Sequence, residues 1–437
     1  MPTICHLFDG IACWEQRVAV GQLLDRLPRD RYRQVLATID PGAVIELGRL
    51  NRPIHSLPQM AGIRPLLASQ VARFVARNRV DVVQAWGPEA AVAAASADCP
   101  VVLELFDPRI AARSARLLRT IARPNGFTVI ASAEWVRRRL IEGGLPPAQI
   151  TVIRPGVDFG LINSARKASL RSELGVADDQ LVIIVPEPAT RAGGQMDAFW
   201  SAALLNHLRR DVRIIVPGES AEAHRIAQFA ATLPTRDALI ATGRRYAFEE
   251  LLPHADVLVV AAEGDASTTA IAWAMSAKVA VIGSAVHSIT ELLAHKVGGL
   301  LFKRHGGFAM NQNRDRKRAA PASLLPAKDR QGGLMSRLAP ALIHACLPAE
   351  CCAADRFNPV PLVKLLADRE AQAKVREAAH GMAYESFGLR RYIDEHVTVY
   401  DSFSSGAGQG PLGAPKQATA PWSLPDSPGR STGLLRP

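Results

Sequence analysis

The sequence predicts an α/β fold of two doubly wound, Rossmann-like domains that face each other across a cleft. The chain has 437 residues, which is enough for two to three domains with cores of their own. Short β-branched runs that end in Gly, Asp or Ser alternate with segments of helical periodicity, as is typical of a parallel sheet covered by helices on both faces. The same alternation starts again after Asp158, which predicts a second domain of the same kind.

The first domain is expected over residues 1–158. Amphipathic segments at 18–27 and 65–78 predict helices that cover its sheet. The buried strands are expected at 3–10, 34–40, 81–87, 101–107, 127–132 and 150–156.

The second domain is expected over residues 159–385. A charged helix is predicted around 166–174. The clearest helix of the chain follows Gly194, because apolar side chains from Met196 to Leu208 fall on one stripe. Strands are expected at 181–186, 213–217, 239–243, 256–262 and 279–283.

Residues 303–359 break this rhythm and are predicted to form a basic loop inserted in the second domain. The formal charge of the chain is +11, from 52 Lys and Arg against 41 Asp and Glu. Between Lys303 and Arg330 there are eight cations and two acids, so this segment contributes +6 of the total. Because aromatic side chains are not interleaved with these cations, we expect no nucleic-acid binding.

The C-terminal part is expected to return to the first domain and then to lose structure. Helical periodicity resumes at 361, and we expect a helix at 386–403 to return to the N-terminal domain. Residues 404–437 are rich in Gly, Pro and Ser and cannot bury enough apolar surface to order themselves, so a disordered tail is predicted.

Composition excludes several classes of protein. About 48% of the residues are hydrophobic, which excludes a disordered or collagen-like chain, and the six cysteines are too scattered for a disulfide framework or a zinc site. No apolar run is long enough to span a membrane, and Asp9, Glu15 and Arg17 interrupt the segment where a signal peptide would be apolar. We therefore expect a soluble, cytoplasmic protein.

Two facing doubly wound domains place two sets of strand ends at one cleft. Ligands of open α/β sheets bind at the carboxyl ends of the strands, often with phosphate groups at helix N-termini. The cleft is therefore the expected binding site.

Several segments are similar, in their order and spacing, to motifs of one known family. The segment Val-Ile-Arg-Pro-Gly-Val-Asp at 152–158 resembles an interdomain motif, and the other similar segments lie at 81–87, 130–136, 273–284 and 291–302. On these segments the chain resembles the retaining glycosyltransferases of family four, which have the GT-B fold. The similarity covers about residues 3–302 and 361–401.

The resemblance implies a function and its partners. It implies transfer of a hexosyl-type sugar from a nucleoside diphosphate sugar to an acceptor such as a polysaccharide or a lipid-linked glycan. It also implies retention of the anomeric configuration, without a bound metal or a separate cofactor. The nucleotide would then lie mainly on the second domain and the acceptor on the first.

The family motif Glu-x7-Glu, which contacts the donor sugar and the ribose, is incomplete in this chain. In the register set by the Ala-Met pair after it, the first position is Asp265 and the second is Trp273. Anchoring the motif on Glu263 instead places an apolar residue, Ile271, in the ribose position. Asp265 and Glu263 are therefore alternative candidates for the catalytic carboxylate, since ionised groups form strong hydrogen bonds to hydroxyl groups. A solvated turn would also account for both.

The acceptor side carries three further candidates. The family often has a His-Asp pair after the fourth strand, and here the pair reads Phe106 and Asp107, so Asp107 remains as a catalytic candidate. Asp9 and Gly10 end the first strand and resemble the family loop that approaches the donor phosphates or the acceptor. A plain turn is the alternative for them.

Donor binding is expected from the loops at the ends of the second-domain strands. The family binds the diphosphate with an Arg followed by a Lys-Gly pair, but here only Arg191 and the nearby Gly193 are present. With one cation the stabilisation of the diphosphate should be weaker. Ordinary turns and helix caps are the alternative. The other donor-binding candidates are Gly218, Gly243, Thr268, Thr269 and Glu291.

These departures leave a second hypothesis open. Trp273, Phe106 and the missing lysine also fit a catalytically silent GT-B protein that binds a nucleotide sugar or serves as a scaffold for a partner.

One helix suggests contact with a membrane. Its arginines recur at intervals of three to four residues, which suits docking on anionic lipid at the inner membrane face. A solvated helix face would give the same spacing. The arginines are Arg113, Arg116, Arg119 and Arg123.

Overall fold

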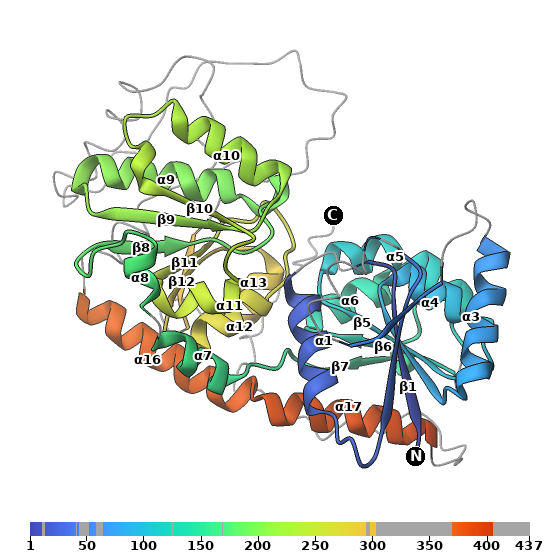
Figure 1. The fold of residues 1–437 in the computed structure, drawn as a ribbon. Coiled ribbons are helices and arrows are strands. Elements are labelled where there is room, and N and C mark those ends of the chain that lie inside the picture. Colours follow the sequence, from blue (N-terminus) through green and yellow to red (C-terminus); the bar gives the residue numbers. More distant parts are fainter. Residues whose placement is uncertain are drawn as a thin grey trace, which may run out of the picture.

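The chain forms two α/β domains, each built on a parallel sheet (Figure 1). The structure is a computed structural model. It describes residues 1–10, 14–40, 42, 52–57, 64–123, 126–167, 169–293, 298–302 and 369–404.

The first sheet has the order β3-β2-β1-β4-β5-β6-β7, and all its pairings are parallel. Strands β1, β4 and β5 are buried at every position because helices cover both faces. The strands are β1 (Thr3–Phe8), β2 (Arg33–Thr38), β3 (Ile54–Ser56), β4 (Val82–Trp86), β5 (Val101–Leu105), β6 (Phe127–Ala131) and β7 (Ile150–Val152).

Two layers of helices cover this sheet. One hydrophobic cluster lies between the sheet and α3 (Arg64–Asn78), α4 (Pro88–Ala94), α5 (Pro108–Ile121) and α6 (Glu134–Glu142). A second cluster lies on the other face, under α1 (Trp14–Arg26) and α17 (Leu389–Ser404).

Buried hydrogen bonds hold α17 on the sheet. In β5, Glu104 accepts the hydroxyl group of Tyr392 at 2.8 Å and lies 3.1 Å from Nε2 of His396. One turn further along, Tyr400 donates to Gln84 of β4 at 2.9 Å. The C-terminal helix is thus a component of the first domain, although its sequence follows the second.

The second sheet has the order β10-β9-β8-β11-β12-β13, again entirely parallel. Its central strands are buried on both sides, as in the first sheet. The strands are β8 (Leu181–Ile184), β9 (Val212–Pro217), β10 (Leu239–Gly243), β11 (Val257–Val260), β12 (Ala280–Ser284) and β13 (Leu300–Phe302).

The helices of the second domain also form two layers. One hydrophobic cluster includes α9 (Gln195–Arg209) and α10 (Ala221–Ala231). The cluster on the other face includes α7 (Phe159–Arg166), α8 (Leu170–Glu173), α11 (Phe248–Leu251), α12 (Thr269–Ser276), α13 (His287–Leu292) and α16 (Arg369–Ser386).

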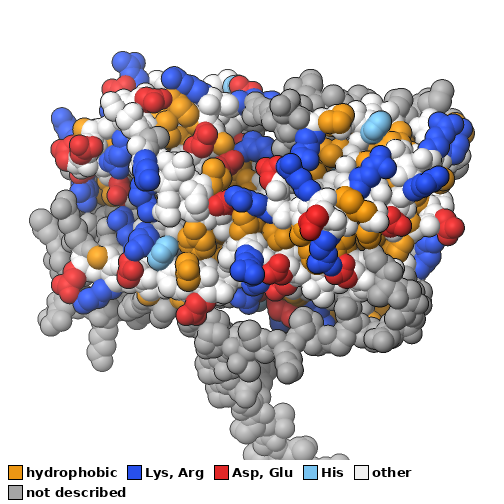
Figure 2. All heavy atoms as spheres, turned by 60° about the horizontal axis from the view of Figure 1, so that its bottom comes forward, with side chains coloured by type: hydrophobic (Ala, Val, Ile, Leu, Met, Phe, Trp, Pro, Cys, Tyr) orange, Lys and Arg blue, Asp and Glu red, His pale blue; other side chains and the backbone are white. Residues whose placement is uncertain are grey.

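The chain crosses between the domains twice, and the two crossings touch. The backbone N–H of Val157 donates to the carbonyl of Phe387 at 2.7 Å. A Cβ on Gly156 would lie 2.8 Å from Cβ of Tyr392, so only glycine lets the linker pass α17 this closely. Figure 2 shows the face that carries α16 and α17, where cationic and anionic side chains are interspersed among hydrophobic ones.

The predicted alternation of strands and helices is confirmed, with local differences. Several strands end earlier than expected, such as the run at 150–156, which pairs only over β7. The single helix expected around 166–174 is wrong, because α7 ends at Arg166 and α8 starts after Ser169. Strands β3 and β13, each of three residues, were not predicted. The predicted insert at 303–359 and residues 405–437 of the predicted tail lie outside the described residues.

Within the described residues, no helix combines the length and the apolar character that crossing a membrane requires.

Candidate functional site

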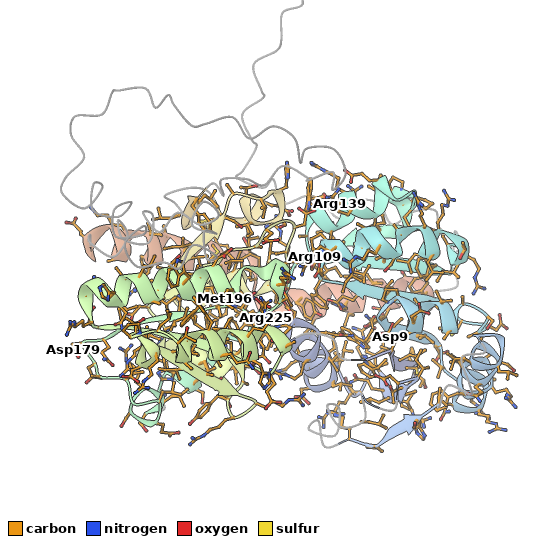
Figure 3. All side chains as sticks on the ribbon, turned by 90° about the horizontal axis from the view of Figure 1, so that it is seen from above. Asp9, Arg109, Arg139, Asp179, Met196 and Arg225 are labelled. Atoms are coloured by element: carbon orange, nitrogen blue, oxygen red, sulfur yellow. The ribbon has the colours of Figure 1, made fainter. Side chains whose placement is uncertain are left out.

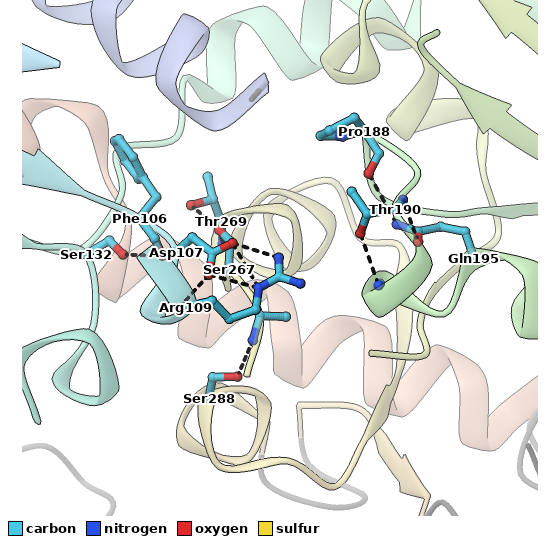
Figure 4. Close-up of polar contacts among 12 residues, drawn as sticks. Phe106, Asp107, Arg109, Ser132, Pro188, Thr190, Gln195, Ser267, Thr269 and Ser288 are labelled. Atoms are coloured by element: carbon cyan, nitrogen blue, oxygen red, sulfur yellow. Dashed lines mark hydrogen bonds and ion pairs between the residues drawn. The ribbon is translucent and has the colours of Figure 1, made fainter. Parts of the chain in front are cut away.

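The carboxyl ends of the two sheets meet at the interdomain cleft. Figure 4 shows Asp107 and Arg109, which follow β5, facing the turn from Thr190 to Gln195 after β8 and the start of α12 at Thr269. Seen from above, Arg109 and Arg139 lie beside the boundary between the domains, while Asp9 lies farther from it (Figure 3). Asp107 therefore faces candidates of the second domain across the boundary, whereas Asp9 does not lie with them.

Asp107 caps α5 and is gripped by an arginine of the same helix. One carboxylate oxygen accepts the backbone N–H of Arg109 at 2.7 Å. The guanidinium of Arg109 folds back on the carboxylate, with Nη2 at 2.7 Å from Oδ2 and Nε at 3.1 Å from both oxygens. This hydrogen bonding to Asp107 raises the pKa of Arg109. Asp107 is thus fixed after the end of β5 as half of an ion pair.

Asp265 lies in the loop after β11 and pairs with the opposite domain. Its Oδ2 accepts Nε and Nη2 of Arg139, on α6, at 3.0 and 2.7 Å. The same arginine donates to Glu142 at 3.0 Å. Hydrogen bonds to Asp265 first and to Glu142 second raise the pKa of Arg139. The strongest catalytic candidate of the second domain is therefore held by a cation of the first.

Glu291 also reaches across the cleft, to the N-terminus of α6. Its two oxygens accept the backbone N–H groups of Glu134 and Trp135 at 2.9 and 2.8 Å. The residue at the N-cap of α6 is Ala133, which has no side chain that could accept them. Glu291 supplies the missing cap, so both of its oxygens already have donors in this arrangement.

The other candidates near α12 differ in exposure. Glu263 is exposed, and its backbone N–H donates to the carbonyl of Ala192 at 2.9 Å, which ties the loop after β11 to the loop after β8. Thr268 and Thr269 are buried at the start of α12. The backbone N–H of Thr269 donates to Oγ of Ser267 at 3.3 Å. Asp265 is better placed than Glu263 for contact with the first domain.

The loop after β8 forms the turn that should face a diphosphate. Thr190 caps the short turn Arg191–Gly193 by accepting the N–H of Gly193 at 3.1 Å. Gln195 fixes the loop from inside with a hydrogen bond to the carbonyl of Pro186 at 3.2 Å. The side chain of Arg191 is exposed. These hydrogen bonds fix the backbone of the loop, and its one cation, Arg191, lies at the surface.

Two predicted glycines of the second domain lie next to each other. The backbone N–H of Gly218 donates to the carbonyl of Gly243 at 3.0 Å, and both residues have positive φ. A Cβ on Gly218 would lie 2.8 Å from Cγ of Glu187. Turn geometry alone therefore requires glycine there.

On the acceptor side, Asp9 caps a helix instead of facing the cleft. Its Oδ2 accepts the N–H groups of Glu89 and Ala90 at the start of α4, at 2.8 and 3.2 Å. Burial raises its pKa to about 6. Gly87, with φ 123°, leaves the space, since a Cβ there would lie 1.8 Å from Oδ1 of Asp9. Gly10, the other acceptor-side candidate, also has positive φ.

Trp273 fills the position where the resemblance expects the ribose carboxylate. Its side chain is fully buried, and its indole N–H has no hydrogen-bond partner among the described residues. It lines a small pocket at the base of the cleft with Phe106, Thr269 and Gly156. An indole can donate a hydrogen bond but cannot accept one, so this position cannot bind a ribose as a glutamate would.

Sequence reasoning missed Trp14, which anchors the first domain in the second. Its ring packs edge-on against Trp273 and Phe248, with centroids 5.7 and 4.6 Å apart. Its indole N–H donates to Glu249, which also lies 3.6 Å from Nη2 of Arg17. The only sequence signal is a large aromatic residue where a helix starts near the cleft.

Both halves of the chain match glycosyltransferase families. Residues 16–160 match the family described as Glycosyltransferase Family 4, and residues 195–311 match the family described as Glycosyl transferases group 1. No curated protein sequence matches the chain.

Solved structures share the arrangement of both domains. HepE of Anabaena in complex with UDP-glucose is 18% identical, with a TM-score of 0.68 over 92% of this chain and 100% of that one. Sucrose-phosphate synthase from Thermosynechococcus elongatus is 13% identical, with a TM-score of 0.62 over 93% and 100%. The chain has the GT-B fold.

The GT-B fold alone does not decide the reaction. A structure from Listeria monocytogenes described as a UDP-N-acetylglucosamine 2-epimerase has a TM-score of 0.57 at 13% identity, over 93% of this chain and 98% of that one. The two family matches are therefore the evidence for glycosyltransferase domains. The reaction has to be argued from the site residues of this GT-B protein.

Proposed function

We propose that the protein transfers a hexosyl-type sugar from a nucleoside diphosphate sugar to a glycan acceptor, with retention of configuration and without a bound metal. The observation that carries this proposal is the convergence of Asp265, Asp107 and the loop of Arg191 on one cleft between two domains that match glycosyltransferase families. The complex of HepE with UDP-glucose makes that donor the first to test.

The proposed roles follow from charge and position. Arg191 and the backbone N–H groups of its turn would neutralise the leaving diphosphate, which is the charge that develops in the transition state. Asp265 would accept hydrogen bonds from sugar hydroxyl groups, with Glu263 as the alternative. Asp107 would face the acceptor. Replacing Arg191 should then weaken donor binding and slow transfer.

A membrane-associated acceptor is supported by the outer surface of α5. Arg113, Arg116 and Arg119 are exposed there, and Arg138 is exposed on the adjacent α6. Cations clustered in this way are attracted to anionic lipid. We propose that the protein is cytoplasmic, contacts the inner membrane face through α5, and acts on a lipid-linked glycan or a growing polysaccharide.

One alternative function has specific support. Trp273 occupies the ribose position, and Asp265 and Glu291 both bind α6 of the opposite domain. These observations favour a silent GT-B protein that holds its domains together as a scaffold.

The first experiment is thermal unfolding with UDP-, GDP- and ADP-linked sugars at millimolar concentration, followed by an assay for release of the nucleoside diphosphate. A ligand at 100 times its dissociation constant stabilises the folded state by about 2.7 kcal/mol, which raises the midpoint by a few degrees. A selective shift with turnover supports the transferase. A shift without turnover supports the scaffold, and no shift with any donor contradicts donor binding.

A further inference from the structure

Helix α6 belongs to the first domain but makes its main polar contacts with the second. Glu291 of α13 accepts the first N–H groups of α6. The Trp135 ring stacks on His287, also of α13, with centroids 4.6 Å apart and planes 6° from parallel. One turn further along α6, Arg139 reaches Asp265.

Three partners fix the guanidinium of Arg139. Nε and Nη2 donate to Asp265, and Nη1 donates to Glu142 at 3.0 Å. The guanidinium carbon also lies 5.1 Å from the centre of the Trp135 ring. A planar guanidinium with this many partners has little rotamer freedom, so it presents a fixed charge and a fixed pair of N–H groups to Asp265.

The carboxylate of Asp265 is only partly used by this contact. Its side chain is 11% exposed. Burying a charge to this extent destabilises the fold unless an opposite charge is paired with it. Both bonds from Arg139 end on Oδ2, which leaves Oδ1 for a hydroxyl group of a substrate. The contact therefore orients the carboxylate without consuming both of its oxygens.

We infer that Arg139 is a positioning residue for sugar transfer, which holds Asp265 in its productive orientation from the opposite domain. The inference rests on the proposed function, in which Asp265 contacts the donor sugar. The catalytic carboxylate is then correctly oriented only while α6 is docked on α13. Approach of the acceptor-side domain therefore also assembles the donor site.

The test compares steady-state kinetics of Arg139→Gln with wild type, starting with UDP-glucose and measuring release of UDP. Misplacing a reacting group by about 1 Å can cost on the order of 100-fold, so kcat should fall by about that factor. KM for the donor should change little, because the nucleotide would bind to the second domain. Arg139→Lys should recover part of kcat, since lysine restores the charge but not the paired geometry.

Two matched controls separate positioning from simple docking of α6. Arg137→Gln removes another arginine of α6, which pairs with Glu134 of the same helix at 3.5 Å, and should leave kcat unchanged. His287→Ala removes the ring stack on α13 without touching Asp265, so its loss of kcat should be far smaller than that of Arg139→Gln. A loss in His287→Ala equal to that in Arg139→Gln would assign Arg139 to docking alone and overturn the inference.

A double substitution completes the test. In an Asp265→Asn background, Arg139→Gln should cause no further loss of kcat if the two residues act as one unit. Additive losses would overturn the inference while leaving the proposed function intact. Wild type that binds a donor without turnover would overturn the proposed function, and the role of Arg139 with it.

Discussion

Single carboxylates in this protein have structural roles that compete with the functional roles expected of them. Asp9 caps α4, Glu291 caps α6, and Asp107 caps α5. Asp9 and Asp107 follow β1 and β5 at the carboxyl edge of the first sheet, where helix N-termini are concentrated, and Glu291 reaches α6 from within α13. A carboxylate at such a place stabilises exposed N–H groups whether or not a ligand ever arrives.

Asp9 should give the stability of the protein a distinctive pH dependence. Burial raises its pKa from 3.8 to about 6, so between these values the folded state binds more protons than the unfolded state. Stability contributed by this group is therefore highest below pH 4 and falls as the pH rises through 6. Relative to wild type, Asp9→Asn should gain up to about 3 kcal/mol of unfolding free energy between pH 4 and pH 7.5.

Urea unfolding of both proteins at the two pH values measures this change. Taking the difference between the proteins cancels the titration of the other carboxylates. If the difference did not vary with pH, the Asp9 carboxylate would titrate normally in the folded state.

At the scale of elements, the structure depends on how α17 is attached to the first sheet. Its hydrogen bonds to Glu104 and Gln84 are buried, and Glu104 is only 3% exposed. A buried carboxylate that loses a donor pays its desolvation cost without compensation. Removing a single polar atom from this attachment should therefore lower the free energy of unfolding.

Tyr392→Phe removes one hydroxyl group and leaves Oε1 of Glu104 without that donor. We expect the free energy of unfolding to fall by about 1–3 kcal/mol, measured by denaturant titration. Tyr384→Phe is the matched control, because Tyr384 on α16 is 69% exposed and keeps its ring contact with Phe159 in the variant. Equal effects of the two substitutions would show that the buried hydrogen bond contributes nothing specific.

The elements were largely predictable from the sequence, and their contacts across the cleft were not. β-branched runs and helical stripes are local signals, so the doubly wound pattern could be predicted without knowledge of partners. The cap that Glu291 gives to α6 involves backbone N–H groups. Every residue except proline has one, so the residue types do not indicate this contact. Arg139 and Asp265 are 126 positions apart, and many arginines could have made that pair. The sequence could place Asp107, Arg191 and Asp265 after the strands that they follow, but it could not reveal the contacts that they make.

At the scale of the whole molecule, Trp14 is a hydrophobic side chain that links the two domains. Trp14 starts a helix of the first domain but belongs to the hydrophobic cluster of the second, with 2% of its surface exposed. Because it packs on Trp273, the residue that departs from the family motif also helps to hold the domains together.

Trp14→Ala should destabilise the contact between the domains. Truncating a buried aromatic side chain costs about 3–5 kcal/mol, and here the loss falls on the interface, so the radius of gyration from small-angle X-ray scattering should increase. Trp200→Ala is the control, because Trp200 packs on Phe229 within the second domain. It should leave the radius of gyration unchanged. An unchanged radius in Trp14→Ala would mean that the other interdomain contacts suffice.

The paired crossings of the chain determine how the domains can move. The linker and the start of α17 pass side by side, joined by the hydrogen bond between Val157 and Phe387. Two adjacent tethers define a line, so the domains can swing about that line but cannot slide along each other. For a given rotation, groups far from this axis move farther apart than groups close to it. Residues on the axis, such as Gly156 and Tyr392, would keep their packing while contacts farther out separate first.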